Sequence, residues 1–205
     1  MTHSASDPHP FDEAYYRRYY FDPKTRVVDP AHAARLADFV AGYVKYLRVP
    51  VRRVLDMGCG IGLWRDPLAH HFPGTRYHGV ELSSYLCERY GWEHGSVTDY
   101  AAPEPFDLVI CQGVLPYLDR TSLRQAIDNL ASLCRGALYV EAVTREDYER
   151  DIIDEERTDP ALHRHRASLY RRCLSAHFRE MGGGMWLSRS MTDTPLFELE
   201  FRDSP

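Results

Sequence analysis

Apolar runs of strand length alternate with segments of helical periodicity through the middle of this chain, and this alternation constrains the fold more than any other feature. Several of the runs are apolar at nearly every position, which is typical of parallel strands covered on both faces. The pattern therefore predicts a doubly wound α/β fold. We expect strands within residues 51–58, 76–82, 92–98, 106–114 and 137–143, and helices within residues 63–72, 83–91 and 121–134, the last closed by Gly136.

The flanking segments extend this pattern on both sides. Asp29 is followed by proline, which is a favourable helix start, and apolar residues recur at helical spacing from there to Leu47. Asp159 is also followed by proline and predicts a second such helix, with its apolar face reaching Phe178. Residues 181–202 are expected to close the chain with a pair of strands separated by a turn.

Composition bounds the class of protein. With 205 residues, of which 44% are hydrophobic, we expect a single domain over residues 1–205. The formal net charge of −5 gives no electropositive surface for nucleic acid or an anionic membrane, which favours a small-molecule or protein substrate. The five cysteines are scattered without a CxxC pair, which is typical of reduced thiols. No secretion signal or membrane-spanning run is recognisable, so we expect a cytoplasmic protein.

The stretch VLDMGCGIG, residues 54–62, places three glycines directly behind an apolar run that contains Asp56. Glycines allow a sharp turn with positive φ and let a ligand approach the main chain, and the helix start that follows presents free amide donors. The dinucleotide fingerprint would need glycine where this chain has Leu63. A carboxylate beside the loop would repel a diphosphate but attract an ammonium group. The loop therefore favours a nucleoside that carries an amino acid.

The same stretch resembles motif I, DxGxGxG, of the class I S-adenosylmethionine-dependent methyltransferases, and the resemblance in order and spacing covers residues 30–143. It implies a Rossmann-like methyltransferase fold, with a seven-stranded, mostly parallel sheet and an antiparallel last strand pair. It also implies S-adenosyl-L-methionine as cofactor and S-adenosyl-L-homocysteine as product. Methyl transfer would proceed by in-line displacement, promoted mainly by holding the reactants close and aligned.

The resemblance also implies which residues bind the cofactor. Glu81 ends the second expected strand, where the family places the ribose hydroxyls. Ser96 stands where the family commonly has an acid beside the adenine amine, which leaves Asp99 or a backbone group as the partner. Gln112 either lines the methionine end of the cofactor or packs in the core. The implied cofactor-binding set is Asp56, Gly58, Cys59, Gly60, Glu81, Leu82, Ser96, Val97, Gln112 and Gly113.

Candidates for catalysis come from three segments. Tyr19 belongs to a tyrosine cluster within residues 1–28, which either folds over the cofactor as an aromatic lid or attaches an N-terminal helix to the sheet. Tyr117 follows the fourth expected strand. Glu141 ends the fifth, where it either orients or deprotonates an acceptor or caps the next segment. Residues 144–180 are expected to form a helical excursion that lines the substrate side.

Charge divides that excursion into two parts. Residues 146–159 are rich in acids, whereas residues 160–179 carry arginines and no acid, a pattern typical of two surface helices of opposite sign. His163 and His165 would point to different faces of a helix, so we expect no metal site there.

The sequence thus predicts a methyltransferase for a small-molecule acceptor, acting as a monomer or homodimer, with the acceptor atom open among oxygen, nitrogen, carbon and sulfur. Three alternatives remain. The chain could be a non-catalytic S-adenosylmethionine-binding partner protein, or a nicotinamide-dependent oxidoreductase. It could also methylate a protein side chain, with the acidic residues 146–159 recruiting a basic peptide.

Overall fold

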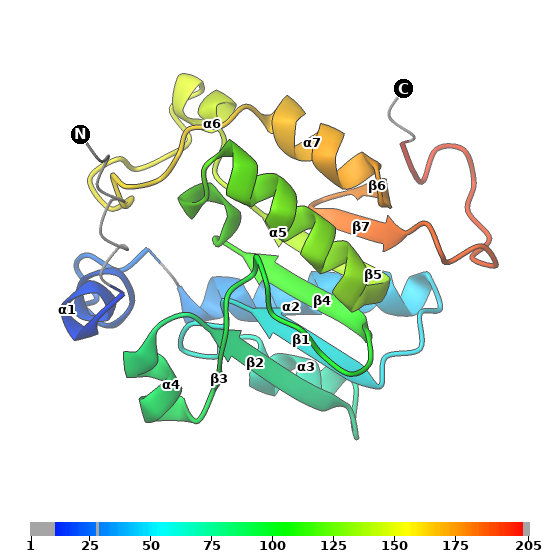
Figure 1. Ribbon diagram of the computed structural model, residues 1–205, viewed down its shortest axis with the longest axis horizontal. Helices are drawn as coiled ribbons and strands as arrows, with labels where there is room; N and C mark the ends of the chain where they lie inside the picture. Colours follow the sequence, from blue (N-terminus) through cyan, green and yellow to red (C-terminus); the bar gives the residue numbers. More distant parts are fainter. Residues whose placement is uncertain (1–10, 28, 203–205) are drawn as a thin grey trace, which may run out of the picture.

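A seven-stranded sheet forms the centre of the computed structural model, which describes residues 11–27 and 29–202 (Figure 1). The strand order is β3-β2-β1-β4-β5-β7-β6. Strands β1 to β5 are parallel, and β7 pairs antiparallel with both β5 and β6. The predicted doubly wound α/β fold with an antiparallel last strand pair is confirmed. The strands are β1 (Arg53–Met57), β2 (Arg76–Glu81), β3 (Glu93–His94), β4 (Phe106–Gln112), β5 (Cys134–Glu141), β6 (Phe178–Gly182) and β7 (Met185–Ser188).

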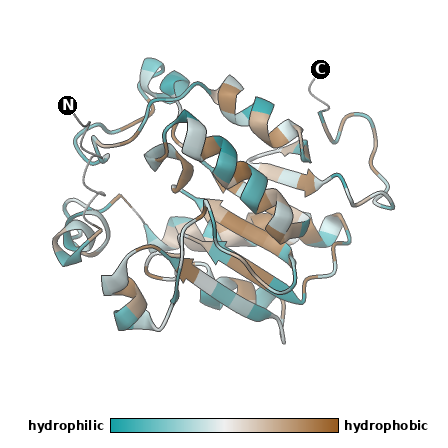
Figure 2. Cartoon of the chain, viewed as in Figure 1, coloured by the Kyte–Doolittle hydropathy of each residue, from teal (hydrophilic) through white to brown (hydrophobic). Residues whose placement is uncertain are grey.

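Helices cover both faces of the sheet. In β4, Leu108 and Ile110 pack in the core beneath α2 and α3, whereas Val109 and Cys111 pack with α5 and α7. Burial on both faces explains why this strand is apolar without alternation, and Figure 2 shows apolar residues concentrated along the central strands. The helices that pack against the sheet are α2 (Pro30–Tyr46), α3 (Arg65–His71), α4 (Ser84–Tyr90), α5 (Arg120–Leu133) and α7 (Ala167–Ser175).

Helix α2 begins where the Asp-Pro pair predicts it. A side-chain oxygen of Asp29 accepts a hydrogen bond from the amide of Ala31 at 3.1 Å, which satisfies one of the free donors of the first turn. Val40 and Val44, at helical spacing, are fully buried against the sheet. Each such side chain contributes about 1.5–3 kcal/mol when it leaves water.

The prediction of a helix that begins after Asp159 and reaches Phe178 is wrong in extent. Helix α7 spans only Ala167–Ser175, and Asp159 precedes an irregular segment in which its side chain caps the turn at the amide of Ala161. Phe178 does not belong to the helix, because it begins β6 and is 1% exposed in the core. A long-range packing contact therefore decides the conformation at a position where local periodicity favours helix.

The closing strand pair lies one segment earlier than predicted. Strand β6 pairs with β7 through a turn at Gly183, so the hairpin lies within residues 178–188. The second expected strand, at residues 196–202, is largely irregular and joins the sheet through an isolated bridge between Glu180 and Arg202.

Gly136 was expected to close helix α5, but it lies within strand β5. A Cβ at this position would come 2.2 Å from the carbonyl oxygen of Asp107 in the neighbouring strand. Close approach of two main chains, and not helix termination, requires glycine here.

The N-terminal segment lies beyond the carboxyl ends of the central strands (Figure 1). Helix α1 (Glu13–Tyr16) continues into the π-helical turn η1 (Arg17–Phe21). Residues 1–10 and Val28, which belong to the predicted segment 1–28, lie outside the described residues. In the part of the chain that the structure describes, none of the helices has the length and apolar character needed to cross a bilayer.

The excursion after β5 is less helical than predicted. It contains the short helix α6 (Arg145–Glu149), an irregular stretch and α7. Its oppositely charged halves do attract each other, because Arg164 bonds Glu155 at 2.7 Å and Arg166 lies 3.7 Å from Glu146.

Candidate active site

The glycine-rich loop leaves the end of β1 and enters α3. Gly58, Gly60 and Gly62 have φ values of 73°, 54° and 79°, in the left-handed region that favours glycine. A Cβ at Gly58 would lie 2.2 Å from a methyl group of Val114, which follows β4. The loop is therefore pressed against the neighbouring strand end, and its main chain faces the carboxyl edge of the sheet.

Glu81 fastens this loop to the end of β2. One carboxylate oxygen accepts a hydrogen bond from the amide of Gly60 at 2.8 Å, and the other accepts from the amides of Leu82 and Ser83 at 2.9 Å and 3.0 Å. The hydroxyl of Tyr16 donates at the longer distance of 3.4 Å. Glu81 is 6% exposed. The carboxylate of Glu81 is therefore held by neutral donors from the glycine loop, the end of β2 and α1.

Asp56 is 2% exposed and accepts a hydrogen bond from the hydroxyl of Tyr77. Burial raises the pKa of Asp56 to about 7, the Tyr77 hydrogen bond opposes this rise, and the charge of Glu81 adds to it. Among the described residues, no cationic side chain forms an ion pair with Asp56. A buried carboxyl of this kind gains from a cationic ligand that restores the lost solvation.

Two adjoining cavities, of about 330 Å³ and about 100 Å³, open beside the loop. Both are lined by Tyr15, Tyr20, Gly58, Gln112, Gly113 and Tyr117. The larger is also lined by Tyr19, Asp56, Cys59, Gly60 and Glu141. The smaller is also lined by Glu81, Leu82, Ser96 and Val97. The structure thus brings each predicted cofactor-binding and catalytic residue to one of these cavities, whereas the described lining residues do not include the alternative Asp99.

The tyrosine cluster of α1 and η1 lies against the glycine loop. The ring of Tyr20 is 3.5 Å from the position that a Cβ on Gly60 would occupy. Tyr16 and Tyr20 pack with ring centroids 5.1 Å apart, and Tyr15 and Tyr19 with centroids 4.8 Å apart. Burial raises the pKa of Tyr16 and of Tyr20, so both hydroxyls stay protonated at neutral pH.

A chain of hydroxyl groups joins the N-terminal segment to the excursion. The hydroxyls of Tyr15 and Tyr117 are 2.7 Å apart, and Tyr117 donates to Asp159 at 3.0 Å. Asp159 is 6% exposed and lines the larger cavity. Sequence reasoning gave Asp159 only a helix-capping role, because an Asp-Pro pair carries no signal of a distant cavity.

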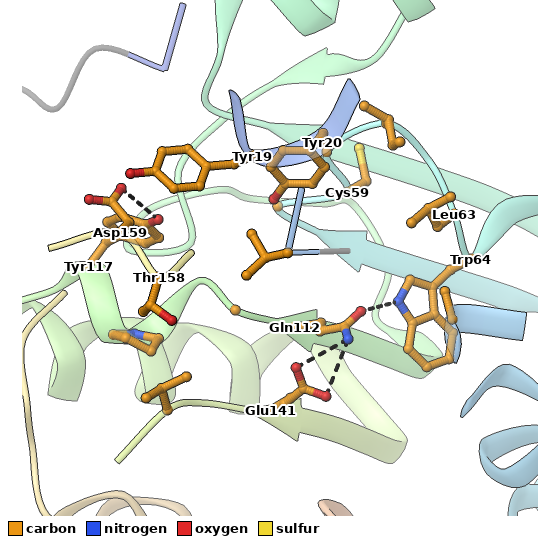
Figure 3. A pocket seen from close by; sticks show the side chains of 18 of the residues that line it. Tyr19, Tyr20, Cys59, Leu63, Trp64, Gln112, Tyr117, Glu141, Thr158 and Asp159 are labelled. Carbon is orange, nitrogen blue, oxygen red and sulfur yellow. Dashed lines mark hydrogen bonds between the residues drawn. The ribbon is translucent and has the colours of Figure 1, made fainter. Parts of the chain in front are cut away.

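A second chain of hydrogen bonds holds Glu141 (Figure 3). The indole of Trp64 donates to the side-chain oxygen of Gln112 at 2.8 Å, and the amide nitrogen of Gln112 donates to both oxygens of Glu141 at 3.2 Å. The hydroxyl of Tyr139 donates to the same carboxylate at 3.0 Å. Gln112 and Glu141 are register partners in β4 and β5, which explains their proximity. Trp64 had no sequence signal beyond a helical pattern.

The histidines of the excursion lie elsewhere. His163 and His165 stack with centroids 5.4 Å apart in an irregular stretch, not on a helix, and the second contacts the carbonyl oxygen of Leu118. No group of three or more metal-ligating side chains gathers within the described ranges 11–27 and 29–202.

A glycine loop, two buried carboxyls and a divided cavity at the carboxyl edge of a doubly wound sheet define a ligand-binding α/β protein of the Rossmann-like class. Residues 55–136 match the family model described as a methyltransferase domain. This match, over residues 55–136 of 205, and the geometry of the site support the predicted class I S-adenosylmethionine-dependent methyltransferase superfamily.

Relatives of known name agree with this placement. The chain is 31% identical over 75 residues to trans-aconitate 2-methyltransferase of Pseudomonas paraeruginosa, covering 33% of this chain and 27% of that protein. It therefore spans about a quarter of the length of the curated relatives it matches. The sugar N-methyltransferase KedS8 from Streptoalloteichus is 26% identical, with a TM-score of 0.52 and coverage of 70% of this chain and 59% of that one. A Pyrococcus horikoshii protein shares the fold with a TM-score of 0.61 at 18% identity, covering 86% and 97%.

Proposed function

We propose that the protein binds S-adenosyl-L-methionine and transfers its methyl group to a small molecule. The cofactor supplies an electrophilic methyl group on a sulfonium. The observation that carries the proposal is that the smaller cavity, beside Glu81, adjoins the larger cavity along Gly58, Gln112 and Gly113. Two ligands bound in these cavities would therefore meet at the ends of β1 and β4.

On the cofactor side, the residues present fit this ligand. Asp56 offers a buried carboxyl with a neutral hydrogen-bond donor, which suits the α-ammonium group. Glu81 retains acceptor capacity on the oxygen bonded to the amide of Gly60, which suits the ribose hydroxyls. Leu82, Ser96 and Val97 line the smaller cavity, which suits the adenine ring. The remaining predicted residues, Gly58, Cys59, Gly60, Gln112 and Gly113, would contact the methionine portion.

On the acceptor side, the main role of the chain is to position the two reactants and enclose them. Transfer in line needs the two reactants close, aligned and shielded from water, and no covalent intermediate. Tyr19, Tyr117 and Glu141 line the larger cavity, where aromatic faces attract a sulfonium and a carboxylate orients an acceptor. We propose that residues 11–27 act as the lid of this site, and that residues 144–180 supply part of its wall through Thr158, Asp159 and Leu162.

A small-molecule acceptor agrees with the size of the larger cavity, because its volume of about 330 Å³ would be shared with the methionine portion of the cofactor. A protein substrate is less favoured, because Glu146 and Glu155 of the acidic segment already pair with Arg166 and Arg164 of this chain. These acids are therefore partly neutralised before any basic peptide arrives.

The test combines binding and transfer. We expect S-adenosylhomocysteine to bind the purified protein in calorimetry, and radiolabelled methyl groups to enter the small-molecule fraction of a cell extract. Gly60→Arg is the matched control, because its side chain would fill the loop beside Tyr20. Binding without any label would favour the non-catalytic partner protein, and label confined to protein would favour a protein substrate. Stabilisation by NADH with indifference to S-adenosylhomocysteine would overturn the proposal.

A further inference from the structure

The acceptor side of the larger cavity carries carboxyl groups from three separate segments. Asp29 precedes α2, Glu141 ends β5 and Asp159 lies in the excursion, and all three line this cavity in addition to Asp56. Of the described residues that line it, none is lysine or arginine, and His32 is the one basic side chain. The electrostatic potential of the cavity is therefore negative, and it is focused by aromatic walls.

The hydrogen bonds of Glu141 hold its carboxylate in place at the wall of the larger cavity. Its hydrogen-bond partners, the amide of Gln112 and the hydroxyl of Tyr139, are both neutral. The indole of Trp64 occupies the side-chain oxygen of Gln112, which fixes the amide so that its nitrogen faces Glu141. Among the described residues, no cation forms an ion pair with this carboxylate. Its orientation is therefore fixed by neutral partners, and no ion pair with a described residue offsets its charge.

Asp159 provides a second anchor at another wall. It accepts hydrogen bonds from the hydroxyl of Tyr117 and the amide of Ala161, and it lies in the part of the cavity nearest Tyr19 and Tyr117 (Figure 3). In Figure 3, Glu141 and Asp159 stand apart, on different sides of the space below the tyrosine rings. An acceptor that spans this space would meet a carboxyl group at each end.

We infer that the acceptor is a small molecule that binds as a cation, with a protonated amine against Glu141, and that its nitrogen receives the methyl group. This inference rests on the proposed methyltransferase function. A carboxylate-bearing acceptor would meet repulsion from every acid of this wall, with no described lysine or arginine to offset it. A neutral alcohol would carry no charge to pair with the carboxylates of this wall.

The transfer of the methyl group to nitrogen balances in charge and in electrons. The bound ammonium gives up one proton, which Glu141 accepts and passes to water. The nitrogen lone pair then forms the bond to the methyl carbon while the carbon–sulfur bond of the sulfonium breaks, and that bonding pair stays on sulfur. The positive charge moves from sulfur to the methylated nitrogen, so no other base or co-reactant is required.

Matched ligands test this on protein saturated with S-adenosylhomocysteine. The probes are three series that share a skeleton and differ in one group: phenethylamine, phenylethanol and phenylacetate; cyclohexylamine, cyclohexanol and cyclohexanecarboxylate; glucosamine, glucose and glucuronate. Ligand-observed NMR titration gives the dissociation constants. We expect the amine to bind at least tenfold tighter than the alcohol and the acid in each series that binds. Preference for an acid or alcohol, or no binding by any series at 10 mM, would overturn the inference.

Glu141→Gln identifies the residue responsible, because it keeps the shape of the side chain and removes the charge. We expect the amine affinity to fall at least tenfold, with the alcohol and S-adenosylhomocysteine affinities unchanged. Glu88→Gln, the same change at an exposed position of α4, should alter none of them. Equal amine affinity in Glu141→Gln and the unchanged protein would refute the assignment. Failure of S-adenosylhomocysteine itself to bind would instead refute the proposed function, so the two failures are distinguishable.

Discussion

The buried carboxyl of Asp56 should make cofactor affinity depend on pH below about 7. Burial raises the pKa of Asp56 from 3.8 to about 7, and the Tyr77 hydrogen bond limits that rise. A shift of one pKa unit corresponds to roughly 1.4 kcal/mol. Ionising Asp56 in the protein without ligand therefore costs at most about 4 kcal/mol more than ionising an aspartate in water. An α-ammonium group of the ligand needs the ionised form.

The sign of the linkage follows from the raised pKa of Asp56. The protonated carboxyl of Asp56 contributes to folding stability. This contribution is fully present below pH 3.8, decreases as the pH rises, and is lost once the pH passes about 7. The affinity for the ligand depends on pH in the opposite direction, because it weakens as the pH falls. Below about pH 7 the ligand must displace a proton from Asp56, so the dissociation constant of S-adenosylhomocysteine should rise about tenfold per pH unit between pH 6.5 and 5.5.

Calorimetry with S-adenosylhomocysteine from pH 5.5 to 7.5 measures this directly. In Asp56→Asn the affinity at pH 7.5 should fall more than tenfold, and the pH dependence should vanish. The same variant should unfold at a higher temperature than the original protein at pH 7.5, because it removes a buried charge. Tyr77→Phe is the companion variant, since losing its hydroxyl should move the midpoint of the binding profile to higher pH.

Retention of the original slope of affinity against pH in Asp56→Asn would refute this role of Asp56. Another group would then carry the proton, and the buried carboxyl would have no part in ligand recognition. Equal thermal stability of the two proteins at pH 7.5 would separately show that Asp56 carries no desolvation cost.

Three further predictions concern the loop, the sheet and the cavity. Glu81→Ala should weaken S-adenosylhomocysteine binding more than tenfold, about 1.4 kcal/mol or above, in the same calorimetric assay, because it removes the proposed ribose acceptor and the carboxylate that fastens the glycine loop. Gly136→Ala should lower the free energy of unfolding by about 2 kcal/mol or more in urea titrations, because its Cβ would meet a carbonyl oxygen of β4. Gly42→Ala, in open space on α2, should instead leave stability unchanged or raise it by up to about 1 kcal/mol. Tyr117→Phe should lower turnover with little change in cofactor affinity, and equal turnover would remove this hydroxyl from the mechanism.

The sheet between residues 53 and 141 could be predicted because local patterns there agree with tertiary structure. Strand β4 is apolar from Leu108 to Cys111 because both of its faces are covered, and α2 begins at a favourable cap. The C-terminal part could not be predicted so well. Phe178 continues the helical periodicity of α7, but its burial in the core places it in a strand. A local pattern does not reveal which of two compatible conformations the core selects.

Site residues at the carboxyl ends of strands could be predicted for a similar reason. Asp56, Glu81 and Glu141 each lie near the end of a parallel strand, and such ends meet at one edge of the sheet. Asp159 and Trp64 reach the cavity through contacts with Tyr117 and Gln112, which lie 42 and 48 positions away in the chain. Nothing in the spacing of these residues indicates those contacts.

The two interpretations of the tyrosine cluster, lid and structural attachment, describe the same contacts. Tyr16 bonds Glu81 at 3.4 Å, longer than the 2.8 Å bond from the amide of Gly60, so it is the weaker of these two donors. Tyr16 bonds one oxygen of this carboxylate, whereas the proposed ribose hydroxyls would bind the other oxygen, beside the amide of Gly60. We therefore expect α1 to keep its contact with Glu81 when the cofactor binds, while Tyr20 stays packed over the loop. The contacts that attach the segment to the sheet would then also hold it over the ligand.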